Sequence, residues 1–428
     1  MKMNNRKGLF ALSPLFVFIA IYLLTSIIKA DFYAIPISVA FMVSCIYAVC
    51  ICKAKNLNAR INVFSKGASS ENIMLMIWIF VLAGAFANTA KTIGSVDATV
   101  NLMLSVLPNN MLLPGLFLAT CFISLSIGTS VGTIVALVPI AAGLAQSLGV
   151  STALMTAIVV GGAFFGDNLS FISDTTIAAT SSQGCSMKDK FRVNFYITLP
   201  AAVVILAIYT FMGMDMHTST SSYDVNIWKV IPYIAVLLTA IMGMNVSIVL
   251  VIGIIMTLAV GLGTGAAGLF PLLHAMGDGI TSMGELIIVT MLAGGMFEVV
   301  RRNGGIEYII EKISSRISGK RGAESVIALL VAIVDVCTAN NTVAIISVGN
   351  IAKRISQKYS IDNRRAASIL DTSSCCVQAI IPYGAQMLMA SGLSQLAPME
   401  IIPYLYYPMA LIVCVALSIV VRYPKKYA

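Results

Sequence analysis

Apolar residues follow one another in long runs from the beginning of this chain to its end. A helix that crosses a lipid bilayer needs about 20 mainly apolar residues, and ten runs approach or exceed that length. These runs are residues 8–28, 32–52, 71–93, 152–180, 189–212, 227–244, 246–263, 284–303, 365–390 and 401–422. Because backbone polar groups find no water inside a bilayer, spanning segments must be helical. The pattern predicts an all-α polytopic membrane protein with about ten transmembrane helices.

Two further apolar regions, residues 112–148 and 323–358, are interrupted midway by polar residues. The interruptions read Thr129-Ser130-Val131-Gly132-Thr133 and Thr338-Ala339-Asn340-Asn341-Thr342. Each flank is about 16 residues long, which is short for a full span. Non-helical backbone at membrane depth is tolerated only where it lines a cavity or packs against protein. We therefore interpret both regions as re-entrant helical hairpins with polar tips, although two full spans would return the chain to the same side.

Two of the spans are predicted to be broken helices. Residues 161–180 read GGAFFGDNLSFISDTTIAAT, and their glycines weaken a helix while the Ser, Thr and Asp side chains compete for its backbone groups. We expect the helix of residues 152–180 to unwind near 166–173. In the span 365–390, Pro382 removes a helical hydrogen bond and predicts the second break.

Basic residues are distributed unevenly between the loops. With a cytoplasmic N-terminus, 24 of the 27 Lys and Arg residues fall in cytoplasmic segments, and only Lys29, Lys91 and Lys229 fall outside. Lys190 is counted as cytoplasmic together with Lys188 and Arg192, at the start of the span 189–212. This asymmetry predicts that both termini are cytoplasmic. It also explains the net charge of +9 without a nucleic-acid partner.

The order of elements is similar in the two halves of the chain. Leu82-Ala83-Gly84 with Gly94 matches Leu292-Ala293-Gly294 with Gly304 at an offset of 210, and the two polar tips match at an offset of 209. Each half would hold five spans, so the halves would have opposite orientations. We predict a first inverted repeat at 1–212, an extracytoplasmic linker at 213–226 and a second inverted repeat at 227–428. Amphipathic stretches at 96–108 and 304–318 are expected along the interface or as connecting helices.

The oxygen-bearing side chains at the breaks and tips form the candidate site. A charged Asp inside a membrane costs at least about 2.5 kcal/mol, so it needs water, a cation or a proton. Hydroxyl, carbonyl and carboxylate oxygens suit a small hard cation. The predicted Na+ ligands are Asp167, Asn168, Ser170, Ser173, Asp174, Thr175, Thr129, Ser130, Thr133, Asn340, Asn341, Thr342, Asp371 and Ser373. The predicted proton-coupling residues are Asp167 and Asp174, followed by Asp371 and Asp335.

Other reactive or charged residues are given simpler interpretations. Asp174 has the alternative of a structural aspartate near the cytoplasmic surface. Glu298 lies close to Arg301 and is expected either to pair with it or to serve transport, whereas Glu324 and Asp278 are expected at the membrane interfaces. The nine cysteines show no paired CxxC motifs, and the two His lie near none of them, so no zinc site or cofactor is expected.

The stretch GDNLSFISDTTIAAT, residues 166–180, resembles the NhaC-type Na+/H+ antiporter family of the ion transporter superfamily. The family pattern is close to G-D-x-x-S-P-x-S-D-T-T, and Phe171 replaces its proline. The resemblance implies an elevator-type fold with two hairpins and two broken helices. It also implies a homodimer formed through scaffold spans. Relatives in the superfamily also exchange organic anions such as malate and lactate.

We interpret the chain as a Na+/H+ antiporter of a bacterial-type inner membrane, with Na+ and H+ as the transported ions. A carboxylate that binds either ion in turn is sufficient for exchange. The alternative is a Na+- or H+-coupled carrier of a small organic acid or amino acid. A cationic group at the midplane would identify that carrier, and the sequence predicts no Lys or Arg there. Helix N-termini are an alternative means of holding a carboxylate. A passive channel and an intramembrane aspartyl protease are further alternatives, but the latter does not explain the repeat.

Overall fold

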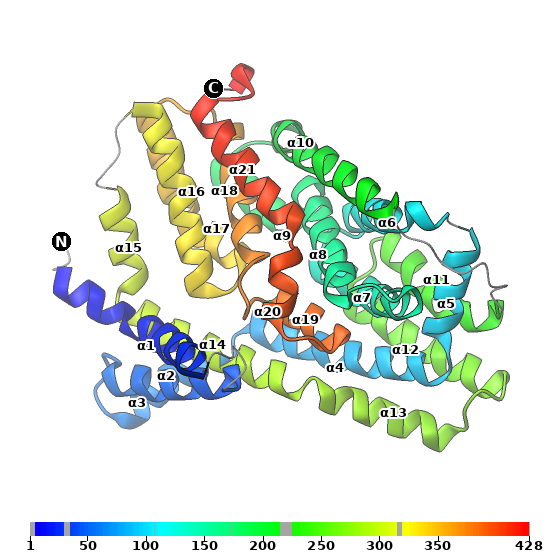
Figure 1. The fold of residues 1–428 in the computed structure, drawn as a ribbon. Coiled ribbons are helices and arrows are strands. Elements are labelled where there is room, and N and C mark those ends of the chain that lie inside the picture. Colours follow the sequence, from blue (N-terminus) through cyan, green and yellow to red (C-terminus); the bar gives the residue numbers. More distant parts are fainter. Residues whose placement is uncertain are drawn as a thin grey trace.

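The computed structural model describes residues 5–29, 35–106, 108–171, 173–214, 225–314 and 319–427, and these residues form helices without a strand (Figure 1). The helices of the first half are α1 (Asn5–Lys29), α2 (Ile37–Ile51), α3 (Leu57–Ala68), α4 (Glu71–Thr92), α5 (Ser95–Val106), η1 (Asn109–Met111), α6 (Leu112–Ile127), α7 (Ser130–Leu148), α8 (Thr152–Leu169), α9 (Asp174–Gln183) and α10 (Met187–Met214). The all-α prediction is confirmed.

The helices of the second half are α11 (Ile227–Ile241), α12 (Val246–Gly263), α13 (Leu269–Ser282), α14 (Gly284–Arg302), α15 (Gly305–Ser314), α16 (Gly319–Thr338), α17 (Asn341–Lys358), α18 (Asn363–Gln378), α19 (Ala385–Ser394), α20 (Pro398–Ile401), η2 (Ile402–Tyr404), α21 (Tyr406–Val421) and η3 (Lys425–Tyr427). Residues 215–224 of the predicted linker, and residues 107 and 315–318 of the predicted amphipathic stretches, lie outside the described residues.

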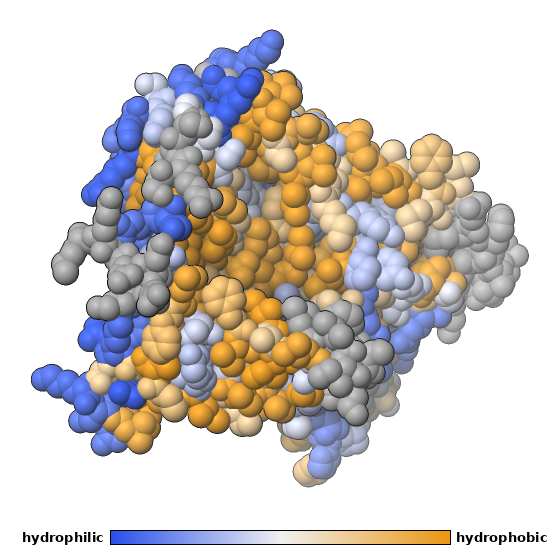
Figure 2. Space-filling view, turned by 60° about the vertical axis from the view of Figure 1, so that its left-hand side comes forward, coloured by the Kyte–Doolittle hydropathy of each residue, from blue (hydrophilic) through white to orange (hydrophobic). Residues whose placement is uncertain are grey.

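Large apolar side chains cover much of the outer surface. Trp78, Phe211 and Phe270 are more than half exposed, and many Leu, Ile and Val side chains accompany them. Figure 2 shows one face on which hydrophobic residues spread over the centre and hydrophilic residues gather along the left-hand edge. A surface of this kind is stable only against lipid, because soluble proteins rarely expose apolar patches of such extent. The chain is a multi-pass membrane protein.

The length and composition of the helices agree with membrane crossing. Within the described residues, six helical segments are long and apolar enough to span a bilayer, or seven if the pair α20–η2 and α21, bent by 56°, is one span. Five shorter apolar helices of 10–17 residues accompany them. The predicted number of about ten spans therefore stays a prediction.

Both predicted helix breaks are present. α8 ends at Leu169, the backbone at Ser170 is extended with φ −65° and ψ 142°, and α9 begins at Asp174. α18 ends at Gln378, and α19 begins only after Gly384, whose backbone is again extended. Each predicted broken span is thus two helices joined by a short non-helical segment.

Both polar interruptions are turns between helices. Between α6 and α7, Gly128 has φ +75°, a conformation that costs glycine little, and Thr129 precedes the next helix. Between α16 and α17, Ala339 has φ +50°, and Asn340 caps the next helix by accepting a hydrogen bond from the Val343 amide. The two helices of each pair pack against each other. That they re-enter the membrane without crossing it stays a prediction.

The two halves present their elements in the same order. A long helix, a glycine with positive φ, a short helix, a helix pair, a broken helix and a last long helix follow one another from α4 to α10 and again from α14 to α21. The two glycines are Gly94 and Gly304, with φ +72° and +87°. The inverted orientation and the repeat boundaries at 212 and 227 remain predictions.

Two helices were not predicted from the sequence. α3 is polar and amphipathic, and α13, at 14 residues, is shorter than a span. α13 joins α14 at Met283 to form an apolar helical segment of 34 residues, Leu269–Arg302 (Figure 1). α13 packs along α4, where Gly84 and Gly279 allow close contact between the two backbones. The predicted span 284–303 is therefore only the second part of a longer helical segment.

The two broken helices lie together in the interior. α18 packs against α8 and α9 (Figure 1). α7, the second helix of the first hairpin, packs against α19, and α17, the second helix of the second hairpin, packs against α9. α8 is buried along nearly its whole length, and it approaches α6 most closely at Gly166. This crossed packing brings the two breaks and the two hairpin tips to one region.

A buried ion pair fixes the end of α21 to α16 and α18. The Arg365 guanidinium donates to both carboxylate oxygens of Glu324, each at 2.7 Å, and to the carbonyl oxygens of Ser418 and Tyr423, each at 2.8 Å. Both side chains of the ion pair are fully buried. We call Arg365, Glu324 and the two carbonyl groups the C-terminal clamp. Glu324 is thus buried inside the protein, and its expected place at a membrane interface stays a prediction.

Candidate functional site

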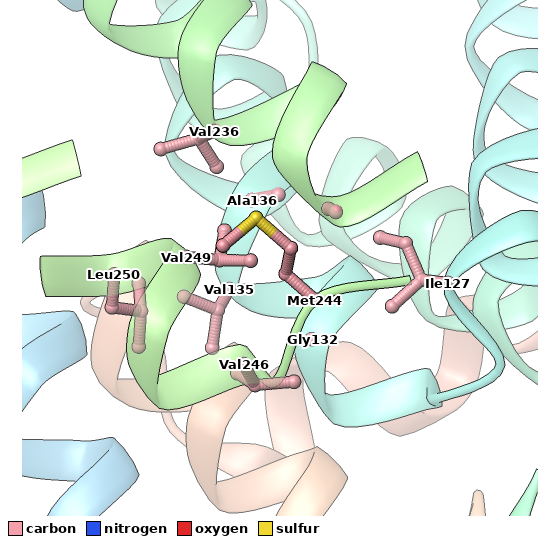
Figure 3. Close-up of a pocket in the computed structure, with 10 residues that line it drawn as sticks. Ile127, Gly132, Val135, Ala136, Val236, Met244, Val246, Val249 and Leu250 are labelled. Carbon is pink, nitrogen blue, oxygen red and sulfur yellow. The ribbon is translucent and has the colours of Figure 1, made fainter. Parts of the chain in front are cut away.

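A pocket between α6, α7, α11 and α12 is lined by apolar side chains and does not suit an ion. Figure 3 shows that side chains such as Val135, Met244 and Val246 surround it with carbon and sulfur. None of the ten residues described as lining it carries a hydrogen-bonding side chain. Its side chains therefore offer no ligand to a cation. Of the two polar interruptions described from the sequence, only Gly132 lines this pocket, and it has no side chain.

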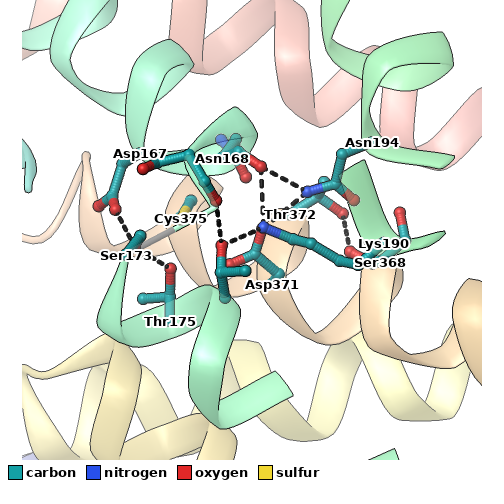
Figure 4. Close-up of polar contacts among 12 residues, drawn as sticks. Asp167, Asn168, Ser173, Thr175, Lys190, Asn194, Ser368, Asp371, Thr372 and Cys375 are labelled. Atoms are coloured by element: carbon teal, nitrogen blue, oxygen red, sulfur yellow. Dashed lines mark hydrogen bonds and ion pairs between the residues drawn. The ribbon is translucent and has the colours of Figure 1, made fainter. Parts of the chain in front are cut away.

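Asp167 lies at the end of α8, where the helix breaks. Its side chain is buried and accepts hydrogen bonds from hydroxyl groups only: Ser130 Oγ at 2.8 Å, and Ser173 Oγ. Ser173 Oγ also lies 2.9 Å from Thr175 Oγ1 at the start of α9 (Figure 4). Gln386 of α19 donates to Ser130 Oγ at 3.1 Å. The first hairpin tip, the first break and the second broken helix therefore meet at this carboxylate.

The local sequence explains why the carboxylate is held at a break. Gly166 brings the α8 backbone against α6, where an added Cβ would lie 2.4 Å from the Leu125 amide nitrogen. Ser170 then leaves the helix, and its carbonyl oxygen accepts a hydrogen bond from Thr176 Oγ1 at 2.9 Å. One hydroxyl group of α9 thus replaces a helical hydrogen bond that α8 can no longer make.

A second polar cluster adjoins the first. Lys190 Nζ lies 2.7 Å from Asp371 Oδ2, 2.8 Å from the Asn168 carbonyl oxygen and 2.6 Å from Thr176 Oγ1 (Figure 4). Asn194 Nδ2 donates to the same Asn168 carbonyl and to Asp371 Oδ2, both at 2.8 Å. The side chains of Lys190 and Asp371 are 1% and 0% exposed. We call this group the lysine cluster.

The position of Lys190 corrects the sequence analysis. The sequence placed it among the charges of a cytoplasmic loop and predicted no cationic side chain near the site. In the structure α10 begins at Met187, so Lys190 lies in the first turn on the same buried face as Val193, Asn194 and Ile197. Apolar residues at helical spacing after Lys190 were the sequence signal that could have found it.

The second hairpin tip lies near the second break. Asn341 Nδ2 is 3.9 Å from Cys375 Sγ, and Gln378 donates to the Ala339 carbonyl at 3.1 Å and to Gln386 Oε1 at 2.8 Å. Because Gln386 in turn donates to Ser130, one chain of hydrogen bonds joins the two tips. The two tips that the sequence singled out are connected in the structure.

Several buried oxygens in this region have no hydrogen-bond partner among the described residues. They are Asn168 Oδ1, Asn194 Oδ1, Asp371 Oδ1 and Ser373 Oγ. Unpaired buried acceptors are costly, and a cation or water is the usual remedy. Among the described residues, no three His, Cys, Asp or Glu side chains come together as a transition-metal site requires. The available oxygens are of the kind that an alkali cation accepts.

Some predicted residues do not face these clusters. Asp174 is exposed in the first turn of α9. Thr133 Oγ1 donates to the Thr129 carbonyl of its own helix at 2.9 Å. Asn340 caps α17, and the Thr342 amide donates to Asn341 Oδ1 at 3.0 Å. The structure does not join Asp174 to Asp167, so the predicted pairing of these two carboxylates finds no support in this geometry.

Asp335 is a further buried carboxyl group, in the last turn of α16 before the tip. It is 0% exposed, and within the part of the chain that the structure describes neither of its side-chain oxygens has a hydrogen-bond partner. Tyr383, next to Pro382 in the second break, donates to the carbonyl of Val336 at 2.9 Å. Asp335 therefore lies beside the second break but apart from the lysine cluster.

Glu298 and Asp278, the other acidic residues considered in the sequence analysis, lie outside the site. Glu298 forms a bidentate pair with Arg301, with both distances 2.8 Å, so the pairing interpretation is confirmed. Asp278 is exposed on α13. Cys375 and Cys376 are buried free thiols.

Comparison with known proteins gives a family match over nearly the whole chain. The model of the family described as "Na+/H+ antiporter family" matches residues 8–214 and 216–423. The relatives include the Na+/H+ antiporter NhaC of Alkalihalophilus pseudofirmus, 22% identical over 58% of this chain and 61% of its own length. They also include the malate-2H+/Na+-lactate antiporter of Bacillus subtilis, 21% identical over 63% of this chain and 64% of its own length.

A third relative is aligned over a greater length. The Na+/H+ antiporter NhaC of Bacillus subtilis is 23% identical over 83% of both chains. The match to the first two relatives spans less than two thirds of their length. All these identities are low, so a relative's substrate does not transfer to this chain by similarity alone.

Proposed function

Because the chain belongs to the Na+/H+ antiporter family, we propose that it exchanges cytoplasmic Na+ for external protons at Asp167. The supporting observation is the environment of this carboxylate, which is buried at a helix break and has only hydroxyl partners. A buried carboxylate without a cationic partner is stable when it holds a proton or a metal cation. Asp167 can therefore alternate between the two transported ions.

Competition for one carboxylate is sufficient to couple the two fluxes. Na+ bound at Asp167 displaces the proton, and a proton displaces Na+, so each crossing of a loaded site carries one ion or the other. The proposed neutral ligands are the oxygens that surround this position. They are Ser130 and Ser173, which contact Asp167, with Asn168, Ser170, Thr175, Thr129, Thr133, Asn340, Asn341, Thr342 and Ser373 as further candidates from the breaks and tips.

We further propose an elevator-type protein of two inverted repeats that works as a homodimer in a cell inner membrane. The shared order of elements in the two halves supports the repeats, and the basic loops support cytoplasmic termini. Asp335, buried and unpaired near the second break, is the proposed additional proton carrier. Asp371 is less suited to that role, because Lys190 already neutralises it.

A second candidate function is coupled exchange of a small organic acid or amino acid. The buried ammonium group of Lys190 favours it, since such a carrier needs a cation to hold a carboxylate. A relative named as a malate-2H+/Na+-lactate antiporter points the same way. However, all three ammonium hydrogens of Lys190 already have acceptors within the protein. Ion exchange therefore stays the first proposal.

The test is a flux assay in proteoliposomes that contain a pH-sensitive dye. A Na+ gradient is imposed with no organic solute present, and proton movement is recorded. We expect Na+-dependent proton movement in the wild type and none in Asp167→Asn, because the amide cannot exchange a proton for Na+. Lowering the pH should raise the Na+ concentration needed for half-maximal rate, since protons compete for the same carboxylate.

Asp278→Asn is the matched control, because Asp278 is exposed on α13 and lies outside the polar clusters. It should exchange ions at the wild-type rate. Undiminished exchange in Asp167→Asn would refute the role of this residue. Well-inserted wild-type protein that moves no protons, but takes up organic acids or amino acids when Na+ is supplied, would favour the second candidate.

A further inference from the structure

The ammonium group of Lys190 is coordinated much as a metal cation would be. An ammonium group has three N–H donors, and here each has an oxygen within 2.8 Å. The three oxygens are a carboxylate of Asp371, the backbone carbonyl of Asn168 and the hydroxyl of Thr176. Carboxylate, carbonyl and hydroxyl oxygens are also the ligands that a small hard cation takes.

The surroundings of this ammonium group provide more acceptors than it uses. Asp371 Oδ1 and Asn168 Oδ1 are buried, and neither has a hydrogen-bond partner. A buried acceptor without a donor destabilises the fold, and a bound cation compensates that cost. The excess of oxygens indicates a site shaped for a cation with a larger coordination number than an ammonium group has.

We propose that Lys190 is a tethered cation that occupies a second cation site, formed by Asp371, the Asn168 carbonyl and Thr176. This inference rests on the proposed function, because it assumes that the exchangeable Na+ binds at Asp167. In the wild type Asp371 does not bind Na+, since Lys190 occupies its site. The site draws its ligands from both broken helices, namely from α8 and α9 of the first and from α18 of the second, while the cation itself comes from α10. Unlike a free ion, the ammonium group of Lys190 cannot dissociate, so it links these helices permanently.

Removal of the tethered cation should open the second site to Na+. In Lys190→Met the long apolar side chain keeps most of the volume, and the carboxylate of Asp371 is left without its counter-ion. A free monovalent cation can then take the vacated position among the same oxygens. In the double variant Lys190→Met with Asp371→Asn no charge remains there, so the additional site should be lost again.

The experiment measures equilibrium binding of radioactive Na+ to the purified full-length protein in detergent. We expect Lys190→Met to bind one more Na+ per chain than the wild type, and the double variant to return to the wild-type number. Lys188→Met is the matched control, because Lys188 is exposed one position after the start of the same helix. It should bind as the wild type does.

A second comparison keeps the inference testable if Lys190→Met does not fold. Asp371→Asn leaves the ammonium group uncompensated near Asp167, which should weaken Na+ binding about tenfold through repulsion. The double variant should restore the wild-type affinity. Equal affinity in the wild type and Asp371→Asn, or no additional Na+ in folded Lys190→Met, would overturn the proposal.

The two proposals can fail separately. If Asp167 is not the exchange site, Asp167→Asn will bind as much Na+ as the wild type does, whatever Lys190 contributes. If Lys190 is only a structural pair, Asp167→Asn will lose its Na+ while Lys190→Met gains none. The number of ions bound by these variants therefore distinguishes the two cases.

Discussion

Asp167 and Asp335 are both buried carboxyl groups, but their partners differ. Asp167 accepts two hydroxyl hydrogen bonds, whereas the two side-chain oxygens of Asp335 have no partner. A carboxylate with no donor and no counter-ion is far less stable than the neutral acid in such a place. We therefore expect Asp335 to hold a proton in this conformation.

Replacement of Asp335 by Asn tests whether that proton takes part in exchange. Asn is a neutral group of similar shape, so Asp335→Asn should fold as well as the wild type and bind Na+ with unchanged affinity. If Asp335 carries a proton, the variant should lose part of the pH dependence of exchange in proteoliposomes. A pH profile identical to that of the wild type would assign Asp335 a structural role only.

Single residues show both the success and the limit of sequence reasoning. Asp167, Ser130 and Ser173 were predicted as one site, because an acid that lies among hydroxyl groups in an apolar span usually serves a function there. Lys190 was missed because loop charges were counted by position in the sequence. Its burial depends on the exact start of α10 and on a partner, Asp371, that lies 181 residues later.

At the scale of elements, glycine and proline positions predicted the breaks. Ser170 and Pro382 lie in the two non-helical segments, where the sequence had indicated loss of the helix. α13 was missed because 14 residues are too few for a span, and only its junction with α14 makes a long segment. A search for apolar runs long enough to span a bilayer does not find a short helix that spans only together with its neighbour.

The close approach of α6 and α8 makes a separate prediction. In Gly166→Ala the new methyl group would meet the Leu125 amide nitrogen at 2.4 Å, and backbone atoms there cannot give way without moving α6. The variant should be destabilised by about 1–3 kcal/mol, as overpacked cores are. We expect a lower midpoint of thermal unfolding and slower exchange, since Asp167 is the next residue.

The matched control is Gly277→Ala. Gly277 lies within α13, and a methyl group there would meet no atom within 4 Å. Alanine favours a helix more than glycine by up to about 1 kcal/mol, so this variant should be as stable as the wild type or more so. Equal stability of the two variants would contradict the tight α6–α8 packing.

At the scale of the whole molecule, the C-terminal clamp joins three helices of the second half. Asp362 and Arg364, just before Arg365, form a comparable pair at the surface, with 26% and 38% of their side chains exposed. The Arg364 guanidinium lowers the pKa of Asp362, which lies outside the membrane-spanning segments. Two neighbouring arginines therefore form ion pairs of similar geometry in very different surroundings.

Arg365→Met and Arg364→Met should differ strongly in stability. The first removes the bidentate partner of the buried Glu324 and leaves only Arg422, whose Nε lies 3.8 Å from Glu324 Oε1, so it should cost up to about 3–5 kcal/mol. The second breaks an exposed pair and should cost no more than about 1 kcal/mol. Thermal unfolding in detergent measures both, and a double variant with Glu324→Gln should recover part of the loss. Equal unfolding midpoints for the two single variants would refute the clamp.

The clamp also sets an order for biosynthesis. Glu324 is made 41 residues before Arg365, but the carbonyl groups of Ser418 and Tyr423 follow it by 53 and 58 residues. When α18 leaves the ribosome, its guanidinium can be neutralised, yet its hydrogen bonds remain incomplete until α21 has followed. A nascent chain that stops before Ser418 thus carries, among membrane helices, an arginine that lacks two of its acceptor groups.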